Sequence, residues 1–356
     1  MGDAPTDMPR LMLAAFVLFL LTGSATAGDL QIFFIDVEGG QATLIVTPAG
    51  ESLLVDAGYG PRAGRAGGPS IAGRDPDRIV AAARAAGISR IDYLLITHFH
   101  NDHVGGVPDL ATKIPIGTFI DYGSPLGSDR MATNGFRTYE PVREGRNHIE
   151  PKPGDRLPLK GMEVDIVSAA GELLASPLPD AGQPNAACDT LEHHVEDGTE
   201  NFRSIGFRLK FGAFRFVDLG DLSGNTLAAL VCPANLLGDV SLYLVAHHGN
   251  YDSNIPALLA AFRPQAAVMN NGAFKGGAPD SFTTLLSQPD MDLWQLHASL
   301  TPRAQNAPDA FVANVDEGAT AYWIKLTAKD DGSFELVNAR TGFARQYGPR
   351  GKKNHR

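Results

Sequence analysis

The histidine-rich run HFHNDH constrains this chain more than any other feature of its sequence. It places His98, His100, Asp102 and His103 directly after IDYLLIT, an apolar strand candidate at 91–97. A lone histidine in such a place is usually a satisfied core residue, but several imidazoles and a carboxylate on one loop are hard to explain structurally. These nitrogen and oxygen donors suit Zn, Mn or Fe. The run therefore predicts a metal site at the end of a buried strand.

Apolar, β-rich runs alternate with segments of helical period from Leu30 onward, which predicts an α/β layered architecture in a single elaborated domain, residues 28–345. A helix is expected over 76–86, capped by Asp75 and ended by Gly87. The other expected helices are 107–113, 223–230, 256–262 and 280–287. The expected strands are 30–37, 42–47, 52–58, 91–97, 162–168, 204–211, 213–219, 239–246, 265–269, 292–297 and 320–327, the second and third forming a hairpin.

Two stretches of the chain, 122–160 and 169–200, are rich in Gly, Pro and charged residues and have weak periodicity. This composition predicts long surface loops. Such loops are the usual place for elements that select a substrate.

The first 27 residues are typical of an export signal. Arg10 precedes an apolar run at 11–21, and an Ala-x-Ala pattern at 25–27 fits a cleavage site. The alternative is a retained anchor, but the run is well short of the roughly 20 residues that span a bilayer. We therefore expect a periplasmic or secreted protein with no stable membrane span after cleavage.

The charge balance limits the partners of the chain. Its formal net charge is -10 at pH 7, whereas proteins that grip long nucleic acid by its phosphates normally present a basic surface. The basic tail at 346–356 is an exception, and it is expected to be a solvated terminus. The charge balance therefore favours a small-molecule or short-oligomer substrate over long nucleic acid, and nothing in the sequence points to a protein partner.

The two cysteines, Cys188 and Cys232, lie far apart and have no CxxC spacing. A disulfide between them would suit an oxidising compartment. Two unrelated buried thiols would fit the sequence equally well.

The run HFHNDH, with a strand before it and two glycines after it, resembles the signature motif of the metallo-β-lactamase superfamily. This resemblance implies an αββα four-layer sandwich whose two sheets meet at a binuclear metal site. It assigns His98 and His100 to site one, and Asp102 and His103 to site two. Zinc is the expected cofactor, as one or two ions, with Mn or Fe as alternatives.

Further motifs resemble the rest of the family's pattern, in the expected order. Asp56, in SLLVDAG, resembles a carboxylate that supports the histidine loop without binding metal, although a simple strand-end turn would also fit. Asp221, in FRFVDLGDL, resembles the aspartate that bridges both metals; Asp218 or a helix N-cap are the alternatives. Of the doublet in LYLVAHHGN, His247 is the expected ligand and His248 the expected proton donor or substrate contact.

The histidine that the family places before the bridging aspartate is missing here. Counting back from that aspartate reaches Glu200 and Asn201 in ENFRSIGF, so Asn201 is expected to be a weak ligand of site one. His193 and His194 lie nearby in a polar loop and are expected to be solvated.

The same departure occurs in the metallo-β-lactamase domain of competence DNA-uptake proteins, which the chain resembles from about Leu30 to His297. Three segments carry this likeness: FIDVEGGQATLI at 34–45, HHG at 247–249 and RPQAAVMNNGAFKGGAP at 263–279. Glu38, Gln41 and Ala278 depart from it, and Ala278 stands where a phosphate-contacting histidine is expected.

Together these residues predict an exported metal-dependent hydrolase. Two divalent metals would lower the pKa of a shared water toward about 7 and supply a hydroxide nucleophile. Asp102, Asp221 and His248 are the expected catalytic residues. The expected substrate is a phosphodiester or related ester. A lactonase, a β-lactam-type amide hydrolase and a non-catalytic metal-binding module are the alternatives.

Overall fold

A computed structural model of the chain describes residues 28–61, 73–191, 197–251, 253–316 and 321–350. The expected export signal, together with His193 and His194, lies outside these residues. Within them, no helix combines the length and the apolar character that crossing a membrane requires.

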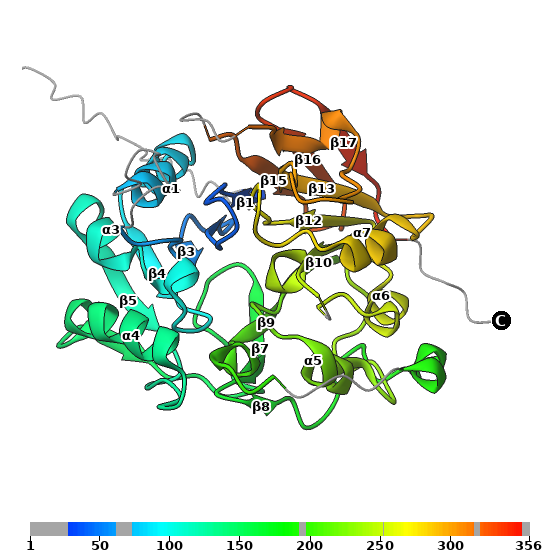
Figure 1. Ribbon diagram of the computed structural model, residues 1–356, viewed down its shortest axis with the longest axis horizontal. Coiled ribbons are helices and arrows are strands. Elements are labelled where there is room, and N and C mark those ends of the chain that lie inside the picture. Colours follow the sequence, from blue (N-terminus) through cyan, green and yellow to red (C-terminus); the bar gives the residue numbers. More distant parts are fainter. Residues whose placement is uncertain (1–27, 62–72, 192–196, 252, 317–320, 351–356) are drawn as a thin grey trace, which may run out of the picture.

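Two mixed β-sheets pack face to face, with helices on both outer sides (Figure 1). In the described residues, the first sheet has the strand order β17-β16-β15-β1-β2-β3-β4-β5-β6 and the second has the order β14-β13-β12-β11-β10-β9-β7-β8. The strands of the first sheet are β1 (Leu30–Phe34), β2 (Thr43–Val46), β3 (Ser52–Val55), β4 (Ile91–Leu95), β5 (Ile116–Ile120), β6 (Asn147–Ile149), β15 (Ile324–Ala328), β16 (Phe334–Asn338) and β17 (Ala344–Tyr347). The strands of the second sheet are β7 (Glu163–Ala169), β8 (Glu172–Leu173), β9 (Gly206–Phe211), β10 (Phe214–Asp218), β11 (Leu242–Leu244), β12 (Ala266–Met269), β13 (Asp292–His297) and β14 (Val312–Asn314).

The helices form the two outer layers. The α-helices are α1 (Arg74–Ala85), α2 (Asn101–Val104), α3 (Val107–Lys113), α4 (Arg130–Arg143), α5 (Gly224–Val231), α6 (Pro256–Phe262) and α7 (Pro279–Leu286). Short 3-10 helices are η1 (Ala186–Thr190), η2 (Glu200–Arg203), η3 (Ala246–Gly249) and η4 (Asp309–Phe311). In Figure 1, α1, α3 and α4 lie on the side of the first sheet, whereas α5, α6 and α7 lie on the side of the second.

Two apolar cores hold these layers together. Between the sheets, the rings of Phe34 on β1 and Phe216 on β10 meet edge to face with centroids 5.9 Å apart. Phe214 and Phe334 meet in the same way at 5.4 Å. The next side chain along β10, Val217, belongs to the other core, with residues of α5, α6 and α7. Successive side chains of one strand thus pack into the cores on opposite faces of the sheet, as the expected four-layer sandwich requires.

The parallel parts of both sheets bring strand ends together. Strands β3, β4, β5 and β6 run parallel in the first sheet, and β10, β11, β12, β13 and β14 run parallel in the second. Loops that follow the carboxyl ends of parallel strands gather at one edge of a sheet, where ligand sites form in such folds. The loops after β3, β4, β10 and β11 carry the residues that the sequence singles out.

Some elements differ from the prediction. The stretch 122–160, expected to be a loop, contains α4 and β6, and the stretch 169–200 contains β8 and η1. The sequence does not predict helix α4, because Gly135 and Pro141 interrupt its helical pattern. Gly135 is needed there, since a Cβ would lie 2.1 Å from the carbonyl oxygen of Phe99. Strands β5, β14, β16 and β17 were not expected either, and β17 pairs with β16 as far as Tyr347, beyond the expected domain end.

The start of α1 also differs from the prediction. Gly73 is the N-cap, in the left-handed conformation with φ 76°, and Asp75 lies inside the first turn. The Asp75 carboxylate instead accepts the backbone N–H of Tyr59 at 2.8 Å. It also pairs with the Arg74 side chain at 2.6 Å. Asp75 therefore fixes the loop after β3 and does not cap the helix.

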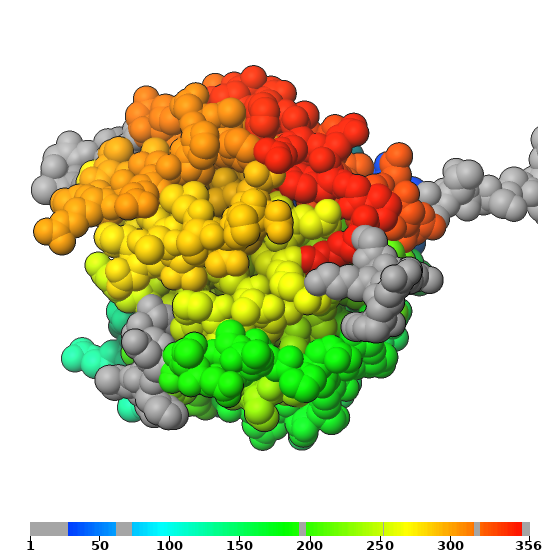
Figure 2. Space-filling model, turned by 90° about the vertical axis from the view of Figure 1, so that its right-hand side faces the viewer, coloured from blue at the N-terminus to red at the C-terminus, as the bar shows by residue number. Residues whose placement is uncertain are grey.

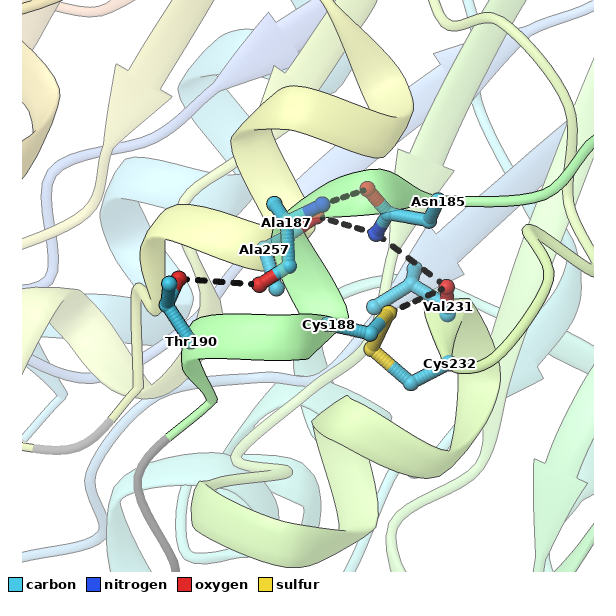
Figure 3. The surroundings of a disulfide bond; sticks show 7 residues. All are labelled: Asn185, Ala187, Cys188, Thr190, Val231, Cys232 and Ala257. Carbon is cyan, nitrogen blue, oxygen red and sulfur yellow. Dashed lines mark hydrogen bonds between the residues drawn. A yellow bond between two sulfur atoms is a disulfide. The ribbon is translucent and has the colours of Figure 1, made fainter.

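Cys188 on η1 and Cys232 after α5 form a disulfide, which settles the choice that the sequence left open. Asn185 reinforces the same contact, because its side-chain amide donates to the carbonyl oxygens of Val231 at 3.2 Å and Ala257 at 2.9 Å (Figure 3). Figure 2 faces the right-hand side of Figure 1, where the green residues lie against the yellow ones. The disulfide thus ties the segment before residue 191 to α5 and α6.

We expect the double variant Cys188→Ser/Cys232→Ser to unfold at lower urea concentration than the wild type. The cysteines are 44 residues apart. Without the bond, the unfolded chain gains conformational entropy, which lowers the free energy of unfolding by about 3 to 4 kcal/mol. Urea unfolding measures the loss, with the wild type in dithiothreitol as the matched control. Reductant should move the wild type to the midpoint of the variant and leave the variant unchanged. Equal midpoints for fully reduced and oxidised wild type would contradict this prediction.

Candidate metal centre

The residues that the sequence singles out come from both sheets. Each lies just after a strand or on a short helix that follows one: Asp56 after β3, His98 and His100 after β4, Asp102 and His103 on α2, Asp221 after β10, and His247 and His248 on η3 after β11. The first sheet therefore supplies the HFHNDH run, and the second sheet supplies the aspartate and the histidine doublet.

His98 and His100 face each other across a short gap. His98 Nε2 lies 3.1 Å from His100 Nδ1. The outer nitrogens of both rings have other partners: His100 Nε2 donates to Asp129 at 2.9 Å, and His98 Nδ1 lies 3.2 Å from the Thr97 hydroxyl and 3.4 Å from that of Ser204. Such outer contacts fix the orientation of a ligating imidazole and leave its inner nitrogen for the ion. The pair therefore has the geometry expected of site one.

A second group of donors lies beside this pair. The ligand atoms of Asp102, His103, Asp221 and His248 all lie within 4.8 Å of one another. His103 Nε2 lies 3.3 Å from Asp102 Oδ2 and 3.2 Å from Asp221 Oδ2. His248 Nε2 lies 3.4 Å and 3.3 Å from the same two oxygens. All four side chains are buried.

Several polar atoms of this cluster lack hydrogen bonds although they are buried. They are His103 Nε2, Asp221 Oδ1 and both ring nitrogens of His248. Buried polar atoms without partners are rare in folded proteins, and a set that converges on one point calls for a ligand. Imidazole nitrogens and carboxylate oxygens in this number suit zinc and related divalent cations. The residues therefore fit a metal ion.

The charges of the cluster are unusual for a buried site. Burial alone would raise the pKa of Asp102, but Lys275 and His103 hold the pKa of that carboxyl well below its usual range. Burial also opposes ionisation of Asp221, whose pKa is nevertheless well below its usual range because of His103 and His248. In turn, these two carboxylates overcome burial and raise the pKa of His103 well above its usual value. A divalent cation would replace the proton that His103 otherwise carries.

The structure separates the two histidines of the doublet. Both have left-handed backbones, with φ 49° at His247 and φ 55° at His248, and this tight turn aims the second ring into the cluster. His247 lies at the rim, where its Nε2 is 3.6 Å from Asp221 Oδ2 and 3.5 Å from the Asn250 side-chain amide. The geometry therefore favours His248, and not the expected His247, as the donor that completes the cluster.

Asp56 has the contacts of a residue that orients the histidine run. It is fully buried and accepts the backbone N–H of Thr97 at 2.8 Å and the Thr97 hydroxyl at 2.7 Å. Its Oδ2 also accepts His103 Nδ1 at 2.7 Å. The carboxylate thereby fixes the His103 ring so that Nε2 points at the cluster, and it lies outside the cluster itself.

Asp218, the alternative to Asp221, lies away from the cluster of donors. Its carboxyl accepts Gln41 Nε2 at 2.8 Å and the backbone N–H of Gly220 at 3.0 Å. Burial raises the pKa of Asp218 from 3.8 to about 7. Asp218 therefore supports the turn before Asp221, and Gln41, a departure from the competence-type pattern, is its partner.

Asp218→Asn is expected to gain stability relative to the wild type as the pH rises. The folded-state pKa of Asp218 is raised from 3.8 to about 7, so its contribution to stability is complete below pH 3.8 and is lost as the pH rises through about 7. An amide has no proton to lose. The unfolding free energy of the variant, minus that of the wild type, should therefore increase by about 2 kcal/mol between about pH 5 and about pH 8. Urea unfolding at both pH values measures this shift, and a difference that does not change with pH would disprove it.

A cavity of about 640 Å³ adjoins the cluster. Asp102, Asp221, His100 and His247 line one side of it, and α4 contributes Met131, Asn134, Gly135 and Thr138. Asn201, on η2, also lines this cavity; it is buried, and its side-chain oxygen has no hydrogen-bond partner. Asn201 is thus placed where a weak additional donor could act.

Sequence reasoning missed two acidic residues beside site one. Asp129 accepts the backbone N–H groups of Met131 and Ala132 as the N-cap of α4, while its other oxygen holds His100. Glu200 is fully buried and accepts the Tyr122 hydroxyl at 2.5 Å. An aspartate before a helical segment is a recognisable cap signal, but here the helical pattern that should follow is interrupted.

Residues 35–182 match the family model of the metallo-beta-lactamase superfamily, a stretch that includes Asp56 and the HFHNDH run. A UPF0173 metal-dependent hydrolase of Cupriavidus metallidurans is 30% identical over 115 residues, which make up 32% of this chain and 34% of that relative. The matched stretch thus spans about a third of the length of that relative.

The solved structures that are similar to this chain at low sequence identity include the following two. The metallo-beta-lactamase fold protein YhfI from Bacillus subtilis has a TM-score of 0.45 and 13% identity, covering 75% of this chain and 96% of that chain. Igni18, a metallo hydrolase from the archaeon Ignicoccus hospitalis, has a TM-score of 0.41 and 13% identity, covering 75% of this chain and 95% of that chain. The likeness to competence DNA-uptake proteins stays a prediction.

Proposed function

We propose that this chain, whose two sheets and family match give it the metallo-β-lactamase fold, is an exported metal-dependent hydrolase. One observation carries the proposal. Buried donors from both sheets converge beside a cavity of about 640 Å³ and include nitrogen and oxygen atoms without hydrogen-bond partners. A purely structural polar cluster would satisfy these atoms within the protein.

The ligand assignment follows the distances. We assign Asp102, His103, Asp221 and His248 to site two, with zinc as the expected ion. His98 and His100 form site one, with Asn201 as a weak further donor. Asp221 Oδ2 lies 3.8 Å from His98 Nε2 and 3.2 Å from His103 Nε2, so this one oxygen lies between the two sites. Site one has fewer strong donors and should bind its ion more weakly.

Ions bound at such sites polarise the bond that is hydrolysed and activate water at neutral pH. The protein's own residues prepare the site for this chemistry. Asp56 and Asp129 hold the rings of His103 and His100 in place. His247, at the rim of the cavity, is placed to contact the substrate or to transfer a proton to the leaving group. We assign it that role in place of His248.

The proposed substrate is a phosphodiester or a related ester of small size. The likeness of FIDVEGGQATLI and HHG to competence-type domains supports this choice, and the net charge of -10 argues against long nucleic acid. The test is metal content and hydrolysis of bis(4-nitrophenyl) phosphate by protein that begins at Gly28, with chromogenic lactone and β-lactam substrates in parallel. Chelation should remove the activity, and zinc should restore it. A protein that retains no metal and hydrolyses none of these compounds would overturn the proposal.

Export is the other part of the proposal. The disulfide between Cys188 and Cys232 supports it, because such bonds persist in oxidising compartments and are rare in the cytosol. Fractionation of cells that express the full chain should place the mature protein outside the cytoplasm, with Gly28 as its first residue. Full-length protein confined to the cytoplasm would contradict export and leave the proposed chemistry untouched.

A further inference from the structure

Lys275 lies in the segment RPQAAVMNNGAFKGGAP, but neither the family resemblance nor the proposed chemistry gives it a role. It lies between β12 and α7, and its ammonium forms an ion pair with Asp102 Oδ2, an oxygen that also faces His103 and His248. The ammonium lies 5.5 Å from the centre of the Tyr59 ring. Among the described residues that line the cavity, Lys275 is the sole lysine or arginine.

The loop around Lys275 is built to hold this side chain in place. Gly276 follows it with φ +69°, and a Cβ there would lie 2.2 Å from the carbonyl oxygen of His248. The Lys275 carbonyl accepts the backbone N–H of Gly272 at 2.8 Å, and the His248 carbonyl accepts that of Gly277 at 2.9 Å. The lysine stem is also packed against Gly39, where a Cβ would lie 2.8 Å from Lys275 Cβ. The base of the side chain is therefore fixed beside the donor cluster, while 37% of the side chain stays exposed.

A cation so close to the proposed metal ligands needs an explanation. If Asp102 held a divalent ion, its oxygen would share its charge with that ion, and the ion would repel the ammonium. The backbone at Lys275 stays beside the donor cluster, because its carbonyl accepts the N–H of Gly272 and the nearby Gly277 donates to the His248 carbonyl. The ammonium would then turn to the cavity that Lys275 lines, where an anionic oxygen on the substrate would supply the missing counter-charge.

We propose that Lys275 is a specificity-determining residue that binds an anionic oxygen of the substrate next to the bond that is hydrolysed. This inference rests on the proposed function and narrows its substrate class. The preferred substrates carry a negative charge at or beside the scissile group, as a phosphodiester does, and neutral carboxylic esters are poor substrates. A charged hydrogen bond of this kind contributes about 1.5 to 3 kcal/mol to binding, which corresponds to a roughly 10- to 150-fold change in affinity.

The kinetic test uses Lys275→Met, which keeps an apolar stem of similar length, and Lys275→Arg, which keeps the charge. Lys160→Met is the matched control, because Lys160 is 76% exposed and pairs with Glu51 away from the cavity. We expect Lys275→Met to raise KM for bis(4-nitrophenyl) phosphate about 10-fold or more, with little change in kcat. KM for neutral 4-nitrophenyl acetate should not change. Lys275→Arg should retain most of the wild-type KM, and an unchanged KM in Lys275→Met would overturn the assignment.

Two equilibrium measurements keep this inference separate from the proposed function. Titration with zinc alone should show equal or tighter binding by Lys275→Met, because the ammonium no longer competes for Asp102; weaker binding would contradict the proposal. Inorganic phosphate should bind the zinc-loaded wild type about 10-fold more tightly than zinc-loaded Lys275→Met. If the wild type hydrolyses nothing but this difference in phosphate binding is present, Lys275 is supported and the hydrolase proposal fails. If phosphodiesters are hydrolysed and phosphate binds both proteins equally, only the role of Lys275 fails.

Discussion

Asp102→Ala and His103→Ala are each expected to abolish metal-dependent hydrolysis while leaving the fold largely intact. Both side chains belong to the buried donor cluster, and Asp102 also pairs with Lys275. Loss of a ligand removes several kcal/mol of metal-derived stabilisation, so kcat/KM should fall on the order of 10³-fold or more. The sheets should persist, because the apolar cores do not include either residue. Steady-state kinetics, metal analysis and circular dichroism on the same preparations measure these effects.

Asp109→Ala is the matched control for Asp102→Ala. Asp109 lies on the neighbouring helix α3, is 29% exposed and pairs with Lys113 at 3.8 Å, so its loss removes one carboxylate without touching the cluster. Its activity and metal content should equal those of the wild type. Wild-type activity in Asp102→Ala or His103→Ala would sink the assignment of that residue to the metal site.

The second large effect separates the two histidines of the doublet. We expect His248→Ala to lose zinc affinity at site two by about 100-fold or more, since even residues that only orient a ligand contribute 10- to 100-fold. His247→Ala should keep its zinc, because the His247 ring lies at the rim, and should lose activity mainly through kcat. Zinc titration with a competing chelator measures both affinities, and each variant serves as the control for the other. The opposite outcome, with zinc lost from His247→Ala and retained by His248→Ala, would restore the ligand that the sequence pattern favoured.

The sequence reveals the parts of the site that short stretches of chain encode. His98, His100, Asp102 and His103 are recognisable because their spacing on one loop is set by local geometry. The predicted α/β sandwich of two sheets and outer helices is confirmed, and its central strands are predictable because they are near-continuous apolar runs bounded by turns. Helix α3 agrees with its expected bounds of 107–113.

The remaining features depend on packing between distant segments. Asp129 meets His100 only because α4 packs beside α2, and a helix containing Gly135 and Pro141 carries little helical signal. Which histidine of the doublet points into the cluster depends on the left-handed backbone of both residues. The residue types at these positions do not predict that conformation. Strands β16 and β17 are hard to recognise because β16 is only half buried and β17 is mostly exposed.

Fold elements with a clear polar-apolar pattern could still be misjudged at their ends. Asp75 looks like a helix cap from sequence, since it precedes Pro76, yet its carboxylate is drawn to the Tyr59 backbone and the Arg74 side chain. Long-range hydrogen bonds of this kind compete with local capping. They lie beyond what the order of residues alone can indicate.

The split origin of the donor cluster has a mechanical consequence. Asp102 and His103 belong to the first sheet's loops, whereas Asp221 and His248 belong to those of the second. An ion coordinated by all four residues would cross-link the two halves of the sandwich. It would also offset the repulsion between the two carboxylates. Free metal at about 100 times its dissociation constant would then add about 2.7 kcal/mol to the free energy of unfolding. The melting temperature of this protein should therefore report the metal supply of its surroundings, and chelation should loosen the seam between the sheets before it unfolds either one.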